Sequence, residues 1–442
     1  MDASPSGHIV NQTARRLIAG LSLMGATLGF VAMAANGAPP AAACDTPTTR
    51  FCDYTPAFGL PPGWNGRLFR LSQNYPAKAP ADSQPWLLVD PKADPAGYAK
   101  LVLGYFFEGN LRPDVASSFD PRLNRVRGWY NAPWQDTGQN GREPIHGLTR
   151  ERVSAKGELG PLQTKPWNNY AVGFYNAPGG VMISKVWANH DKPDPSKAIA
   201  PEGTVAAKLL FSTASDAQVP WLKGSPAWDG YVLADVNNAN PGPNDKRAVR
   251  RVRLLQIDFA VKDSRAGPTG WFFGTFVYGG GPTGKPGSGW GNVAPVGLMW
   301  GNDPGYGGAG PLKESWINPA VSMPHLGYQG RLNGPVDNPK SSCLSCHATA
   351  ESPKPILDLI NGLLPPTGAD AATIARWFRN LPPGTPFTPG KIALDNSMQI
   401  AFGISGFEAQ RAASKIADPA SRRKAQAQIL EIQKQPARGG AE

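Results

Sequence analysis

The sequence predicts an α+β protein with an antiparallel β-sheet core, a helical C-terminal segment and a loop-rich N-terminal extension. Glycine and proline are frequent, 51 and 46 of 442 residues, and follow no period, which is typical of a strand-rich chain with many turns. Short apolar runs separated by turn residues fill the middle of the chain, and helical spacing replaces them near the C-terminus. The 41% of hydrophobic residues, with 13 tryptophans, can build a core.

Residues 1–38 have the pattern of an export signal. Arg15 and Arg16 precede the apolar run LIAGLSLMGATLGFVAMAA, and the small residues Ala32 and Ala34 suit a cleavage site. We therefore expect an exported, periplasmic protein. The alternative for this run is an uncut membrane anchor, since its length is close to that of a membrane span. No other segment is apolar and long enough, so we expect no membrane span in the mature chain.

Two of the four cysteines follow this signal closely. Cys44 and Cys52 lie eight residues apart, and in an oxidising compartment a Cys44–Cys52 disulfide is the simplest prediction. The alternative is a lipid anchor at Cys44, because AAAC resembles a lipoprotein site. That anchor would leave Cys52 without a partner.

Residues 45–160 are expected to form the loop-rich extension, in which AGYAKLVLGYFFEGNL (96–111) is a helix or a strand. The β-rich domain is expected over residues 165–355. Its predicted strands have alternating apolar and polar residues or are continuously apolar. The five strands are 168–176, 179–187, 203–211, 250–261 and 270–280, and the first two flank the turn 177–180 as a hairpin. Five strands with turn-rich connections favour an antiparallel sheet.

The glycine-rich stretch 281–342 is expected to be loop. The C-terminal segment, residues 356–435, is expected to be helical, because helical spacing recurs over 354–364, 369–380 and 418–435.

The stretch SSCLSCHATA, residues 341–350, carries the clearest chemical signal. Cys343, Cys346 and His347 have the spacing of a c-type haem attachment motif, in which two thiols bond the porphyrin vinyl groups and the histidine ligates the iron. The alternatives are a thioredoxin-like redox pair or half of a zinc site. A zinc site needs two more ligands and a thioredoxin motif needs a βαβ pattern, so we predict one covalent haem c with His347 as the proximal iron ligand.

The other axial ligand is open. Met398 follows His347 by 51 residues, a separation typical of methionine-ligated cytochromes, and is a candidate distal ligand. The alternative is that Met398 packs in the core beside Ile400 and Phe402.

The formal net charge is +11, from 44 Lys and Arg against 33 Asp and Glu. These basic residues are scattered, which indicates a solvated basic surface or one that attracts an acidic redox partner protein. No nucleic-acid-binding motif is present, so we expect no nucleic-acid partner.

Four motifs occur in order along the chain: PEGTVAAKLLF (201–211), the VKDS and Gly-Trp elements within LLQIDFAVKDSRAGPTGWFFGTFVYG (254–279), and CLSCH. Together they resemble the cytochrome P-460 and cytochrome c-prime-beta family over roughly residues 165–355. The resemblance implies an antiparallel sheet packed on helices, with the haem on one face and its motif near the C-terminus. It also implies a haem open to small ligands such as nitric oxide. In the cytochrome P-460 branch a lysine of the Gly-Thr-Val strand is cross-linked to the porphyrin and the protein oxidises hydroxylamine; the matching position is Lys208.

From the residues alone, Lys208 lies on the polar face of its strand, where a lysine is ordinarily solvated. The loop after residue 280 is longer than in that family, so the sequence places no acid opposite the iron. We expect electron transfer by an exported monohaem cytochrome. The alternatives are a haem oxidoreductase or gas binder acting on hydroxylamine or nitric oxide, and a binding protein that the haem only stabilises.

Overall fold

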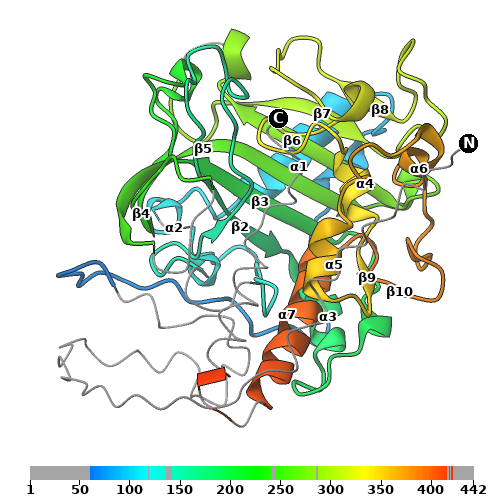
Figure 1. The fold of residues 1–442 in the computed structure, drawn as a ribbon, viewed down its shortest axis with the longest axis horizontal. Helices are drawn as coiled ribbons and strands as arrows, with labels where there is room; N and C mark the ends of the chain where they lie inside the picture. The colour runs from blue at the N-terminus through cyan, green and yellow to red at the C-terminus, as the bar shows by residue number, and fades with distance from the viewer. Residues whose placement is uncertain are drawn as a thin grey trace, which may run out of the picture. The chain divides into compact units, whose positions relative to one another are not determined.

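An eight-stranded antiparallel sheet separates two layers of helices and loops (Figure 1). The computed structural model describes residues 60–415 except 118, 136–141, 240–244 and 285–286, together with 418, 420 and 421. The strand order is β1-β2-β3-β5-β6-β7-β8, and β4 pairs with β5. The strands are β1 Thr149–Arg150, β2 Asn169–Tyr175, β3 Val205–Ser212, β4 Ala227–Leu233, β5 Arg247–Lys262, β6 Trp271–Tyr278, β7 Val293–Met299 and β8 Ser315–Ile317.

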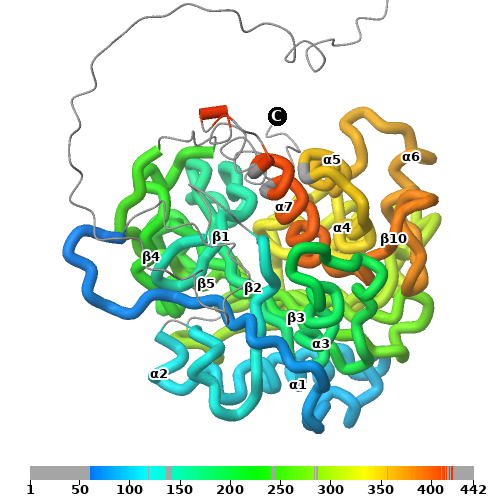
Figure 2. Tube along the Cα trace, turned by 90° about the horizontal axis from the view of Figure 1, so that it is seen from below, coloured from blue at the N-terminus to red at the C-terminus, as the bar shows by residue number. Residues whose placement is uncertain are grey.

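The α-helices among the described residues lie on both faces of the sheet (Figure 2). They are α1 Pro95–Phe107, α2 Pro113–Ala116, α3 Ala177–Val186, α4 Cys343–His347, α5 Ile356–Asn361, α6 Ala371–Ala375 and α7 Met398–Ser414. Short 3-10 turns connect several elements. A separate two-stranded sheet pairs β9 Glu351–Ser352 with β10 Ile392–Ala393. These elements confirm the predicted α+β class with an antiparallel core.

Residues of α1 share the core on one face of the sheet. Tyr98, Val102 and Phe106 are buried in the same apolar cluster as strand residues such as Phe174 and Phe272. The stretch forms a helix and not a strand because Pro95 begins the first turn and the Asp94 carboxylate accepts a hydrogen bond from the Gly97 N–H.

Residues of α3, α4 and α7 share a second cluster on the opposite face. In Figure 2, α4 and α7 lie across the sheet from α1. The CLSCH motif and the C-terminal helix therefore meet on one face, whereas α1 covers the other.

The predicted hairpin over 168–187 is wrong in its second half. Residues 169–175 form β2, but 177–186 form the helix α3. Asn176 caps α3 by accepting a hydrogen bond from the Gly179 N–H, and Pro178 occupies the first turn. The apolar run resembles a strand because the helix is buried on most sides, which removes the usual amphipathic period.

The strands predicted over 203–211, 250–261 and 270–280 are confirmed as β3, β5 and β6. The sequence does not predict four further strands of the sheet, β1, β4, β7 and β8. The stretch 281–342 is not all loop, since it contains β7 and β8, and β7 carries Pro295 and Gly297, which disfavour a strand by propensity. The missed strand β4 contains Asp229 and Gly230.

Helices over 354–364 and 369–380 are confirmed in shorter form as α5 and α6. The helix expected over 418–435 lies almost wholly outside the described residues, as do the signal segment 1–38 and both Cys44 and Cys52. None of the helices in the described part of the chain is long and apolar enough to cross a membrane.

Candidate functional site

The short helix α4 presents the motif residues to a cavity between the sheet, α4 and α7. A capping box begins this helix: the Ser342 hydroxyl accepts from the Ser345 N–H and the Ser345 hydroxyl accepts from the Ser342 N–H. The cavity has a volume of about 360 Å³, and Cys343, Cys346 and His347 line it. Two other residues predicted for the site, Lys208 and Met398, line it too. The fold thus brings together every predicted site residue that the structure describes.

The sheet supplies a floor of mixed side chains. Ala171 and Gly173 of β2, Ala206 of β3 and Ala260 of β5 line the cavity, and none is larger than a methyl group. By register, Ala206 and Ala260 stand in one row between Tyr175 and Phe273, and Gly173 stands in the next row with Lys208 and Asp258. The two alanines leave apolar space at the centre of the first row, beside a polar row.

The imidazole of His347 is held in one tautomer. Its Nδ1 lies 2.8 Å from the backbone oxygen of Asn396. A carbonyl oxygen can only accept, so Nδ1 carries the hydrogen and Nε2 keeps a lone pair. Burial lowers the pKa of His347, and the positive charge of Lys208 lowers it further, which keeps the ring neutral. A neutral imidazole with a free Nε2 is the form that ligates a metal.

The two thiols are free and protonated. Cys343 and Cys346 form no disulfide with each other in the structure. Burial raises the pKa of Cys346 to about 12 and that of Cys343 well above its usual value. A thioredoxin-like pair instead requires a thiol of lowered pKa. Within the described residues no group of three or more His, Cys, Asp or Glu side chains could hold a metal ion, so the zinc alternative lacks further ligands.

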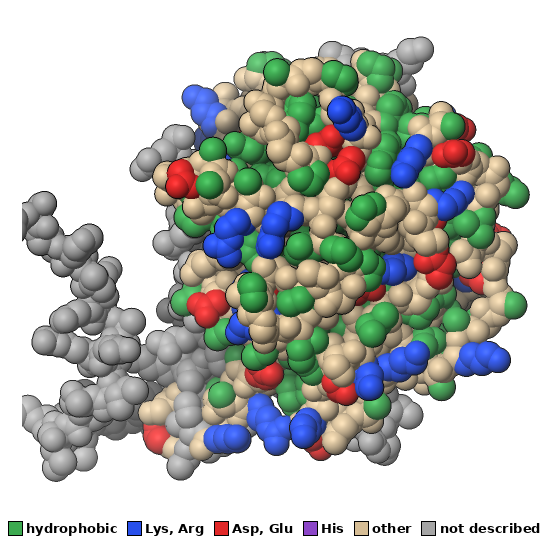
Figure 3. Space-filling model, turned by 90° about the vertical axis from the view of Figure 1, so that its right-hand side faces the viewer, with side chains coloured by type: hydrophobic (Ala, Val, Ile, Leu, Met, Phe, Trp, Pro, Cys, Tyr) green, Lys and Arg blue, Asp and Glu red, His purple; other side chains and the backbone are tan. Residues whose placement is uncertain are grey.

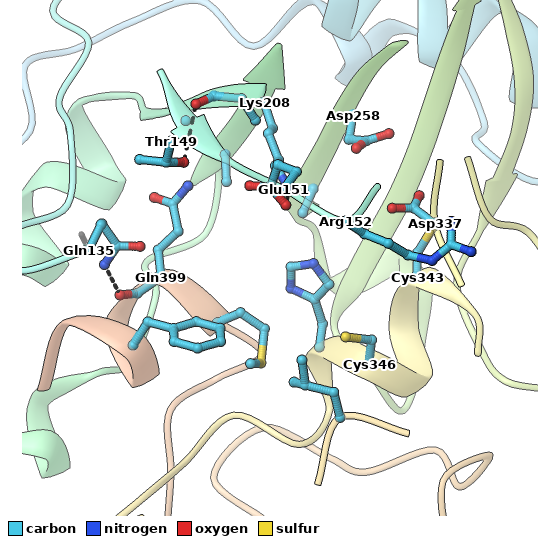
Figure 4. Close-up of a pocket in the computed structure, with 18 of the residues that line it drawn as sticks. Gln135, Thr149, Glu151, Arg152, Lys208, Asp258, Asp337, Cys343, Cys346 and Gln399 are labelled. Atoms are coloured by element: carbon cyan, nitrogen blue, oxygen red, sulfur yellow. Dashed lines mark hydrogen bonds and ion pairs between the residues drawn. The ribbon is translucent and has the colours of Figure 1, made fainter. Parts of the chain in front are cut away.

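Lys208 lines the site and is half-buried there, paired with an acid. Its Nζ lies 3.0 Å from a carboxylate oxygen of Glu151, and only a third of its side chain is exposed. In Figure 4, Lys208 and Glu151 lie together on the strand side of the cavity. Burial alone would lower the pKa of Lys208. The negative charges of Glu151, Asp258 and Asp337 have the larger effect and raise that pKa.

Two acids that the sequence analysis did not select complete this polar group. Asp258 of β5 is the sheet neighbour of Lys208, and Asp337 lies near Cys343 (Figure 4). The Gln256 amide donates to both Asp258 oxygens at 2.7 and 2.8 Å and to Asp337 at 3.1 Å, and the Thr275 hydroxyl donates to Asp258. Burial and the charge of Asp337 raise the pKa of Asp258 to about 7.

A signal for Asp258 was present in the sequence. With Gln256 it interrupts the apolar run LLQIDFAV, and an acid inside an apolar strand indicates a functional site when it is buried. Asp337 and Glu151 carried no such signal, because both lie outside predicted elements.

Met398 begins α7 and is buried, with 8% of its surface exposed. Its Sδ lies 3.9 Å from the Thr349 hydroxyl, two residues after His347, and Asn396 on the same segment contacts the His347 ring nitrogen. The methionine thus lies beside the motif helix, within reach of the cavity.

Comparison of the chain with models of known protein families, with curated proteins and with solved structures finds no match.

Proposed function

We propose that the chain binds one haem c covalently through Cys343 and Cys346, with His347 as the proximal ligand, and that it is an exported monohaem electron-transfer protein. One observation carries the proposal. Two free thiols and a neutral imidazole with its Nε2 lone pair available line the same cavity, which Ala206 and Ala260 of the sheet also line. This donor set fits a haem, which would supply a one-electron couple when bound.

The surface charge agrees with either solvation or partner docking. On the face in Figure 3, Lys and Arg side chains are spread among Asp, Glu and apolar side chains and form no single patch. With a net charge of +11, attraction of an acidic redox partner would act through the field of the whole molecule.

A second function, a haem oxidoreductase or gas binder of the cytochrome P-460 kind, is favoured by the polar group in the cavity. Lys208 faces the site from the Gly-Thr-Val strand, as a porphyrin cross-link at this position requires. Asp258, with a pKa of about 7, exchanges a proton near neutral pH, as a general base for hydroxylamine needs. An electron carrier needs neither residue.

The first experiment tests haem attachment. The chain is produced with a haem c maturation system, and covalent haem is measured on a denaturing gel and as the pyridine haemochrome. We expect one haem per chain, a single thioether in Cys343→Ser or Cys346→Ser, and none in the double variant. Absence of covalent haem in the wild-type chain would refute the proposal.

The second experiment separates the two functions. A low-spin spectrum of the reduced protein that carbon monoxide does not change supports electron transfer alone, whereas a spectrum that changes supports an open ligand site. A red-shifted reduced Soret band that disappears in Lys208→Arg supports the cross-link. Lys223→Arg, at the end of a surface turn, is the matched control and is expected to change nothing.

A further inference from the structure

The segment between β10 and α7 has an unusual backbone where it meets the haem motif. Asp395 and Asn396 both have positive φ, 45° and 60°, although neither is glycine. Two successive residues in this region persist only where the surrounding structure holds them. We call residues 395–397 the proximal loop, because Asn396 is the residue whose carbonyl contacts His347.

The Asp395 carboxylate is what ties the proximal loop to the sheet. It is 4% exposed and accepts hydrogen bonds from three elements. Lys262 at the end of β5 donates from Nζ to its two oxygens at 2.8 and 3.0 Å. The Trp271 indole at the start of β6 donates at 2.9 Å, and the Ala200 N–H before β3 donates at 2.9 Å. Donors at the end of β5, at the start of β6 and before β3 thus fix the direction of the carboxylate.

The next peptide group then has little freedom. The Asn396 carbonyl accepts the His347 Nδ1–H at 2.8 Å. On its other side, the Ser397 hydroxyl lies 2.6 Å from the Tyr175 hydroxyl and caps the first turn of α7. The carbonyl is therefore held between an anchor at Asp395 and an anchor at Ser397.

We infer that Asp395 is a positioning residue for His347: by holding the proximal loop, it fixes the Asn396 carbonyl against Nδ1 and so sets the tautomer, the orientation and the basicity of the imidazole. The inference rests on the proposed function in one respect, since the atom that this basicity would serve is a haem iron. Hydrogen-bond partners of a ligating histidine orient its ring and strengthen it as a ligand.

A purely structural ion pair would behave differently from a positioning residue. Loss of a structural pair lowers the stability of the fold and leaves the His347 tautomer alone. Loss of a positioning residue also changes the imidazole, and this can be measured with and without haem.

The test compares Asp395→Asn with Asp263→Asn. Asp263 is a matched control, because it is a buried carboxylate next to Lys262 in the chain but is bonded by Tyr98 and Arg265 instead. In the haem-free chain, the ¹⁵N shifts of the His347 ring report its tautomer. We expect Nδ1 to be protonated in the wild type and in Asp263→Asn, and a mixture of tautomers in Asp395→Asn.

In the haem-loaded chain, the midpoint potential reports the basicity of His347. A weaker hydrogen bond at Nδ1 makes the His347 imidazole a poorer electron-pair donor to ferric iron. We therefore expect a more positive midpoint potential in Asp395→Asn and no change in Asp263→Asn. A tenfold change in the ferrous to ferric ratio corresponds to about 59 mV for one electron.

The possible results separate the inference from the proposed function. Wild-type chain without covalent haem refutes the proposed function, while the ring tautomers still decide the role of Asp395. Normal haem loading with an unchanged tautomer and potential in Asp395→Asn overturns the inference alone. If Asp395→Asn does not fold, Trp271→Phe removes a single donor to Asp395; a smaller shift of the same sign supports the inference, and no shift refutes it.

Discussion

Replacement of Asp258 by Asn gives the sharpest test of the electrostatics of the cavity. In the folded chain the pKa of this carboxyl is raised from 3.8 to about 7, first by burial and then by the charge of Asp337. The folded state therefore holds a proton that the unfolded state has lost between these two values. Over that range the wild-type stability falls as the pH rises, and above it the loss is complete.

The size of the effect follows from the raised pKa. Each pKa unit corresponds to about 1.4 kcal/mol, so a rise of roughly three units costs at most about 4 kcal/mol at pH 8. Water that enters the cavity screens the charge, and we expect on the order of 1–4 kcal/mol. Below about pH 4 the cost is absent, because the carboxyl is protonated in both states. Asparagine keeps the shape and has no charge to bury.

The assay is urea unfolding of the purified wild-type chain and of Asp258→Asn at pH 4 and pH 8. We expect the variant to gain stability relative to wild type at pH 8 and to gain little at pH 4. The exposed strand residue Asp229 provides the control variant Asp229→Asn, which should follow the wild type at each pH. Equal stability differences at pH 4 and pH 8 would show that Asp258 is ionised normally and that the reasoning is wrong.

Three other predictions concern the rest of the site and the core. Lys208→Met removes the cation that opposes the repulsion between Asp258 and Asp337, so the apparent pKa of Asp258 should rise further, by carboxyl NMR, whereas Lys208→Arg should leave it near the wild-type value. Met398→Leu conserves volume and should lower the free energy of unfolding by less than about 1.5 kcal/mol. The haem spectrum should not change, because the methionine sulfur contacts Thr349 beside the motif helix. Loss of a low-spin spectrum would instead show that Met398 ligates the iron. Phe106→Ala in α1 should cost about 3–5 kcal/mol in one cooperative transition, since Phe106 packs on Phe174 of the sheet; a separate early transition would show an independent N-terminal unit.

Local patterns in the sequence were enough for much of the sheet and for the helices α5 and α6 in shorter form. Alternation predicted β5, and apolar runs bounded by turns predicted β3 and β6, because side chains of a strand alternate whatever it pairs with. Similar reasoning failed for 177–186, where an apolar run bounded by glycine and proline is a buried helix. A fully buried element has no polar face, so its period does not separate helix from strand.

What the sequence by itself determined is the class of fold, several of its strands and the spacing of Cys343, Cys346 and His347, because each depends on residues close together in the chain. Only the tertiary structure decided what surrounds them. Asp395 meets Lys262 across 133 residues of sequence, and Lys208 meets Glu151 through the pairing of three strands. Such contacts depend on strand register and on the packing of α7 against the sheet, which no local spacing records.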